Sequence, residues 1–237
     1  MNRRTGLWIA LAIAVIAALM VSRRRPAAPN EPVAFSHPRD AQNPAFTGSQ
    51  QPNDQSGFYV LAMSWAPNFC DDPSKPHSSS ECDPHRHLGF IVHGLWAQDA
   101  NGSPAPDCPD ASPLPQGTVN QLLQYIPDRG LIAHEWQRHL SCHFTSQNIV
   151  AAFQQAASAV QVPQSYRNPQ DAISVSPQQI ETDFARQNNA QPTDYRTSCH
   201  AGKLVNFEAC LTSDFKPRAC ASMPDCPAGK IALDRVP

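Results

Sequence analysis

Apolar and polar residues follow one another along this chain in short blocks, and the period of each block predicts its secondary structure. Nearly continuous apolar runs predict buried strands, while apolar positions that recur every three or four residues predict amphipathic helices. Ser176 and Pro177 mark a helix start, because serine caps the first turn and proline fits its first helical position. We expect strands at 58–65, 88–93 and 204–211, and helices at 118–125, 130–142, 146–160 and from 176 onward. Separate strands and helices without repeats predict the α+β class.

The N-terminal part has a different pattern. Residues 7–21 form an apolar run with arginines on both sides, a length that is borderline for spanning a bilayer. We predict that residues 1–22 are a membrane anchor, with 5–22 as the membrane-contacting part; the alternatives are a cleaved signal peptide and a buried core helix. Residues 23–56 are rich in Pro, Ala, Asn, Gln and Ser, which predicts a flexible linker. The folded domain is expected at 57–237.

The cysteines and the charge limit the class of protein further. The chain has eight cysteines and no paired Cys-x-x-Cys array, which favours four disulfides over a zinc site: Cys70, Cys82, Cys108, Cys142, Cys199, Cys210, Cys220 and Cys226. Because disulfides need an oxidising compartment, we expect export to the periplasm or the extracellular space. Residues 57–237 carry 12 Lys and Arg against 17 Asp and Glu. This balance argues against binding nucleic acid by bulk charge, so any RNA contact needs a local positive site.

Two segments carry candidate chemistry: 91–96, which reads Ile-Val-His-Gly-Leu-Trp, and 134–142, which reads His-Glu-Trp-Gln-Arg-His-Leu-Ser-Cys. At about 100° per residue, a helix places four polar side chains of the second segment within roughly 140° of one another: His134, Glu135, Arg138 and His139. Imidazoles that move protons and a cation that takes up developing charge suit a phosphodiester. His93 is expected at the carboxyl end of its strand. A zinc site is disfavoured, because His134 and His139 are five residues apart instead of four.

These segments resemble the two active-site motifs of the ribonuclease T2 family. His93-Gly94-Leu95-Trp96 matches its His-Gly-Leu-Trp-Pro motif, and 134–142 matches His-Glu-Trp-x-Lys-His-Gly-Thr-Cys. The segment 64–70 and the later elements at 176–184 and 204–211 resemble the family as well. The departures are Ala97 for Pro, Arg138 for Lys and Leu140 for Gly. Ala97 is expected to loosen a turn after Trp96, and Leu140 is strained if its position needs a positive φ.

The resemblance implies an α+β fold with a central, mostly antiparallel sheet, flanking helices and disulfides. It implies an endoribonuclease that cleaves single-stranded RNA through its own 2′-hydroxyl, giving 2′,3′-cyclic phosphate ends with low base specificity. No metal or cofactor is implied, DNA is not a substrate, and we expect a monomer. The resemblance gives each residue a role: His139 as general base, His93 as general acid, His134 for phosphate binding, Glu135 and Arg138 for transition-state charge, and Trp96 for base stacking.

The resemblance also suggests the disulfide pairs Cys70–Cys82 and Cys108–Cys142. For the remaining four cysteines we choose Cys199–Cys226 enclosing Cys210–Cys220, although sequence alone does not fix their connectivity. Trp136 is expected in the core. Histidines outside the motifs are expected to be surface or packing residues: His77, His85, His87, His143 and His200. The rival functions are a metallohydrolase and a catalytically weakened RNA- or protein-binding protein on the same fold.

Overall fold

The computed structural model describes residues 57–75, 79–108, 111–220 and 225–237. Its strands are β1 (Phe58–Trp65), β2 (Phe90–Gln98), β3 (Ile173–Val175), β4 (Tyr195–His200), β5 (Lys203–Leu211) and β6 (Ile231–Leu233). Its α-helices are α2 (Ala66–Asp71), α3 (Gln116–Leu122), α4 (Arg129–Glu135), α5 (Ile149–Ser158) and α6 (Pro177–Asn188). A π-helical turn (Trp136–Leu140) continues α4, and short 3₁₀ turns lie at Ser80–Cys82, Pro84–Arg86, Gln164–Tyr166 and Pro192–Asp194.

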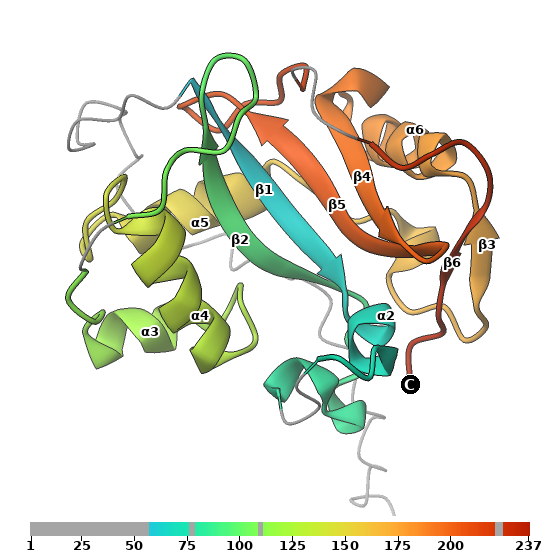
Figure 1. Cartoon of the computed structure of the whole chain (residues 1–237), viewed down its shortest axis with the longest axis horizontal. Coiled ribbons are helices and arrows are strands. Elements are labelled where there is room, and N and C mark those ends of the chain that lie inside the picture. The colour runs from blue at the N-terminus through green and yellow to red at the C-terminus, as the bar shows by residue number, and fades with distance from the viewer. Residues whose placement is uncertain (1–56, 76–78, 109–110, 221–224) are drawn as a thin grey trace, which may run out of the picture. The chain divides into compact units, whose positions relative to one another are not determined.

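The strands form one mixed sheet with the order β2-β1-β5-β6-β3, and β4 pairs with β5. β1 lies between β2 and β5 and is antiparallel to both. The pairings β4–β5 and β3–β6 are also antiparallel, whereas β5 and β6 are parallel. In Figure 1, α3, α4 and α5 lie on the β2 side of this sheet and α6 lies on the β4 side. The predicted α+β class, with a mostly antiparallel sheet and flanking helices, is confirmed.

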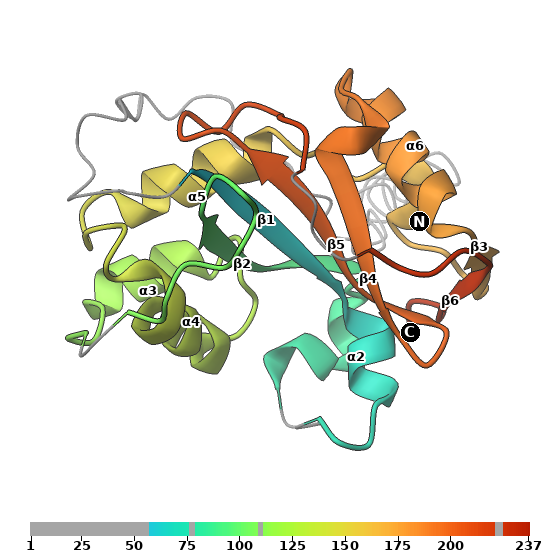
Figure 2. The same ribbon diagram turned by 45° about the horizontal axis from the view of Figure 1, so that its top comes forward.

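Alternation along β1 separates the two faces of the sheet. Tyr59, Leu61, Met63 and Trp65 belong to the main hydrophobic core, which is shared with residues of α5 and α6. The opposite side chains begin with Phe58 and Val60, which form a small second cluster against which Trp96 packs. Figure 2 shows the sheet running between the helical group at β2 and the pair α6–β4. β1 is fully buried because both of its faces are covered along most of its length.

Most of the expected elements occur near their predicted positions. β1 has the predicted bounds, β5 begins one residue before the predicted strand, and Ser176 caps α6 by accepting a hydrogen bond from the Gln179 amide. Four elements had no clear periodic pattern and were not predicted: α2, β3, β4 and β6. β3 and β6 have three residues each; they pair with each other, and β6 also pairs with β5.

All four expected disulfides are present: Cys70–Cys82, Cys108–Cys142, Cys199–Cys226 and Cys210–Cys220. The predicted anchor (1–22) and linker (23–56) lie outside the described residues, so both stay predictions. Within the part of the chain that the structure describes, no helix has the length and apolar character needed to cross a bilayer.

Candidate active site

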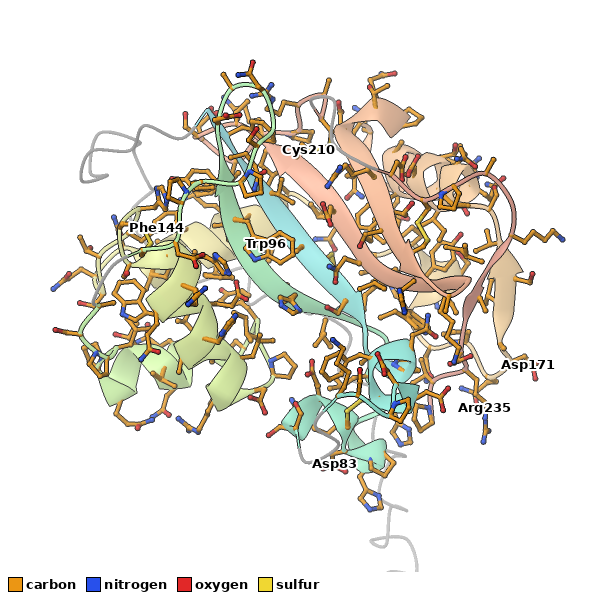
Figure 3. All side chains as sticks on the ribbon, viewed as in Figure 1. Asp83, Trp96, Phe144, Asp171, Cys210 and Arg235 are labelled. Carbon is orange, nitrogen blue, oxygen red and sulfur yellow. A yellow bond between two sulfur atoms is a disulfide. The ribbon has the colours of Figure 1, made fainter. Side chains whose placement is uncertain are left out.

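His93 lies in the middle of β2, at a break in its pairing with β1. Ala62 of β1 pairs with Gly94, and the next residue, Met63, pairs with Val92. His93 is therefore the extra residue of a β-bulge, a feature that often directs a side chain toward a functional site. The prediction that His93 ends its strand was wrong, because pairing with β1 carries β2 on to Gln98. Trp96, further along β2, packs against the second cluster, on the face of the sheet opposite the main core (Figure 3).

Only the first part of the second motif forms an α-helix. α4 ends at Glu135, and the chain continues as the π turn, where the Ser141 amide donates to the Trp136 carbonyl five residues back. In such a turn, residues five apart lie above one another. The rings of His134 and His139 consequently come to 5.8 Å between centroids. The separation expected from an α-helix was therefore wrong for His134 and His139, because the π turn brings their rings close together.

The Glu135 carboxyl lies at the centre of the cluster and is 1% exposed. Its Oε2 accepts a hydrogen bond from Trp96 Nε1 at 2.9 Å, and its Oε1 lies 3.4 Å from His93 Nε2. Gly94 makes this approach possible, because a Cβ there would lie 2.0 Å from Oε2. The Trp96 ring lies 5.6 Å from the His93 ring and 6.5 Å from the His139 ring.

Burial shifts the proton affinities of this cluster toward its uncharged forms. Desolvation, with the charges of His134 and His139 as smaller causes, lowers the pKa of His93 to about 4. Desolvation raises the pKa of Glu135 to about 7, although the Trp96 hydrogen bond opposes the shift. Burial also lowers the pKa of His139, and the Asp107 carboxylate acts against that effect. Both shifts act in the same sense, because burial favours the neutral imidazole of His93 and the protonated carboxyl of Glu135.

Arg138 occupies a more exposed position than the other motif residues. Its side chain is 57% exposed and forms an ion pair with Asp107, whose other oxygen lies 3.8 Å from His139 Nδ1. Asp107 is held next to the π turn because the following amide, of Cys108, donates to the Arg138 carbonyl at 2.8 Å. The structure thus brings Arg138 beside His139 through a shared carboxylate.

The departures from the family motifs are accommodated without the expected strain. Leu140 is helical, is 2% exposed and packs in the main core, and it is absent from the residues with positive φ in the described chain. Ala97 lies inside β2 and is 5% exposed, so no turn follows Trp96 for it to loosen. The expectation for Ala97 was therefore wrong, and the condition under which Leu140 would be strained, a positive φ, is not met. Trp136 is 7% exposed and donates to the Ser112 carbonyl, which confirms its core position.

Three residues near the cluster were missed by sequence reasoning. Ser64 Oγ lies 2.9 Å from His93 Nδ1 and donates to Asn206 Oδ1, and Asp107 contacts Arg138 and His139. No local pattern marks them, because each reaches the site through strand pairing or a disulfide-linked loop. Outside the motifs, His85, His87 and His200 are exposed as expected, His143 is half-buried, and His77 lies outside the described residues.

The π turn also bears on metal binding. Ligand atoms of His134, Glu135 and His139 all lie within 4.8 Å of one another, a compact set of donors. The argument that a spacing of five residues separates the two imidazoles fails for a π turn. A second group, Cys108, Cys142 and His143, has both of its sulfurs in a disulfide.

The site of this α+β protein thus brings three imidazoles close to one buried carboxyl, and these are groups that acid–base chemistry can use. A sequence model of the ribonuclease T2 family matches residues 56–215, which is more than half of the chain. The chain therefore belongs to the ribonuclease T2 family. It is 38% identical over 119 residues to a probable ribonuclease of Haemophilus influenzae, covering 45% of this chain and 44% of that protein. The chain thus spans less than half the length of this curated relative.

Solved structures share the fold. An RNase-related protein from Calystegia sepium superimposes with a TM-score of 0.61 at 13% identity, covering 78% of this chain and 100% of its own. A variant of RNase MC1 in complex with 5′-UMP gives a TM-score of 0.55 at 19% identity, covering 73% of this chain and 97% of its own. At these identities the likeness concerns the fold alone.

Proposed function

We propose that this protein is an endoribonuclease that cleaves single-stranded RNA. The 2′-hydroxyl attacks the adjacent phosphorus, and the products carry 2′,3′-cyclic phosphate and 5′-hydroxyl ends. The observation that supports this most directly is the gathering of His93, Glu135 and His139 around Trp96 in a member of the ribonuclease T2 family. A substrate that supplies its own nucleophile needs only a base, an acid and charge stabilisation.

His139 is the proposed base. Burial lowers the pKa of His139 and so favours the neutral imidazole, the form that can take the 2′-hydroxyl proton. Its partly exposed ring, next to Trp96, is accessible to a nucleotide. Stacking of a base on the indole would be tolerant of base identity, which suits low specificity.

His93 is the proposed acid, and Glu135 is the carboxyl group next to the nitrogen that carries the transferred proton. The raised pKa of Glu135 favours the protonated carboxyl, whose Oε1 faces His93 Nε2 at 3.4 Å. An anionic phosphodiester bound beside the imidazole favours its charged form, which can then protonate the leaving 5′-oxygen. While protonated, Glu135 can instead donate to a phosphoryl oxygen, which an ionised carboxylate would repel.

His134 and Arg138 are proposed to bind the phosphate. His134 is exposed beside His139, and Arg138 must exchange its Asp107 partner for phosphate oxygens. If Arg138 stabilises developing charge, Arg138→Ala lowers kcat far more than it raises KM, and Arg138→Lys retains much of the activity. A kcat for Arg138→Ala within about twofold of the parent would show that the arginine serves only its exposed ion pair with Asp107.

The test uses the full chain, polymeric RNA and EDTA, with the products identified by ³¹P NMR. We expect cyclic-phosphate ends, no cleavage of DNA, and losses of about 10²–10⁴-fold for His93→Ala and for His139→Ala. His85→Ala is the control, because it removes an exposed imidazole outside the cluster. Full inhibition by EDTA would favour a metallohydrolase, and RNA that is bound but left intact would favour the binding protein.

The proposal extends to partners and location. Four disulfides within the described residues suit an oxidising compartment, so we propose a monomer exported to the periplasm or the extracellular space. Residues 5–22 are the proposed membrane-contacting segment. Fractionation of cells that express the full chain would test the location, and N-terminal sequencing of the recovered protein would show whether residues 1–22 are retained.

A further inference from the structure

A row of polar side chains crosses the sheet beside His93. Ser64 of β1 pairs with Asn206 of β5, and Asn206 pairs in turn with Ser198 of β4. The neighbouring residues Trp65 and Phe207 belong to the main core, so this row lies on the opposite face, which also carries Val60 of the second cluster. Ser64 is 3% exposed, whereas Asn206 and Ser198 are half-buried. The proton-transfer chemistry described above assigns no role to any of the three.

The donor and the acceptor can be assigned for each hydrogen bond that Ser64 makes in this row. Ser64 Oγ donates its single proton to Asn206 Oδ1 at 2.9 Å. The same Oγ lies 2.9 Å from His93 Nδ1, so it must accept there, and Nδ1 must carry a proton. Nε2 is then the ring nitrogen left to gain and lose a proton. It is also the nitrogen that faces the Glu135 carboxyl at 3.4 Å.

We propose that Ser64 and Asn206 are positioning residues that fix the orientation and the tautomer of the general acid. This inference rests on the proposed function, in which His93 is that acid. The Nε2–H bond breaks as the bond between phosphorus and the 5′-oxygen breaks. The proton goes to the oxygen, the electron pair stays on Nε2, and Nδ1–H remains bonded to Ser64.

The β-bulge explains why the His93 side chain needs support from this row of polar side chains. His93 has no partner on β1, so regular pairing does not hold its side chain in place. Ser64 and Asn206 are cross-strand partners in the two central strands, and both are anchored by the backbone ladder. A rigid anchor of this kind lets a bulged residue keep one ring orientation, as a proton donor requires for a defined approach to the leaving group.

The experiment compares two substrates that differ in their need for an acid. RNA requires protonation of its 5′-oxygen, whereas a nucleoside 3′-(4-nitrophenyl phosphate) releases a stable phenolate without it. Ser64→Ala should lower kcat on RNA by about 10–100-fold, part of the 10²–10⁴-fold attributed to a general acid, with KM nearly unchanged. The same variant should stay within about threefold of the parent on the nitrophenyl ester.

Two further variants keep the test decisive. Asn206→Ala removes the acceptor of the Ser64 hydroxyl and should show the same selective loss of RNA cleavage. This variant can carry the test in case Ser64→Ala folds poorly. Ser198→Ala is the matched control, because its Oγ accepts from the Asn206 backbone amide and lies one strand further from His93. Imidazole ¹⁵N NMR of the parent should show the Nδ1–H tautomer at His93, and Ser64→Ala should lose that preference.

The outcomes separate the two proposals. If His93→Ala abolishes RNA cleavage while both Ser64→Ala and Asn206→Ala stay within about twofold of the parent, the positioning role is wrong and the proposed function stands. Equal losses on both substrates, or a raised KM alone, would mean a structural or substrate-contact role instead. If His93→Ala itself leaves RNA cleavage intact, the assigned mechanism fails first.

Discussion

Gly94→Ala is the substitution whose effect follows most directly from the geometry of the site. A Cβ at this position would lie 2.0 Å from Glu135 Oε2 and 2.7 Å from Trp96 Nε1. Ordinary contact begins near 3.4 Å, so the carboxyl must retreat by about 1.4 Å. Glu135 is 1% exposed and held between His93 and Trp96, which leaves it little room to move.

The expected consequence is a large kinetic loss. A displacement of about 1 Å at a reacting centre can cost roughly 10²-fold, so kcat on RNA should fall by about that factor or more. The measurement is steady-state cleavage of a short single-stranded RNA, together with thermal unfolding of the same samples. Gly117→Ala is the matched control, because a Cβ on that α3 glycine meets nothing within 4 Å.

The control separates a local clash from a general effect of alanine. Gly117→Ala should keep its activity and gain up to about 1 kcal/mol in free energy of unfolding, since alanine favours the helix. A Gly94→Ala protein that folds and cleaves RNA within about threefold of the parent would refute the reasoning. Catalysis would then not depend on the observed position of the Glu135 carboxyl.

Three further outcomes follow from burial and covalent structure. Since burial lowers the pKa of both His93 and His139, the plot of kcat/KM against pH should be bell-shaped with its maximum on the acid side of pH 6.5. Its two limbs report the coupled pair of histidines and are not assigned to single residues. A rate that rises up to pH 9 would contradict this. Replacing Cys108 and Cys142 by alanine opens a loop with a sequence separation of 34 and should cost about 4 kcal/mol of stability by urea unfolding; an unchanged midpoint would argue against it. Glu181 has its pKa raised to about 7 by desolvation, so ionisation destabilises the fold as pH rises from 4.5 through 7. Glu181→Gln should therefore add up to about 3 kcal/mol at pH 8 and little at pH 4, and equal effects at both values would exclude this cause.

Sequence reasoning was sufficient where the determining interactions are local. The apolar run at 58–65 predicts β1, and Ser176 followed by Pro177 predicts the start of α6. The two histidine motifs carried the resemblance to the family to which the chain belongs. These features depend on residue types within a few positions of one another, so they can be read directly along the chain.

Only the tertiary structure decided how the site is assembled. The bulge at His93 arises from the register between β2 and β1, which no residue of β2 specifies alone. The π turn shifts His139 over His134, a departure from the α-helical period that the motif itself does not reveal. Ser64 and Asn206 are 142 positions apart and meet only because β1 and β5 pair. The types of chemical group are therefore a property of the sequence, whereas their distances and proton affinities follow from long-range pairing and burial.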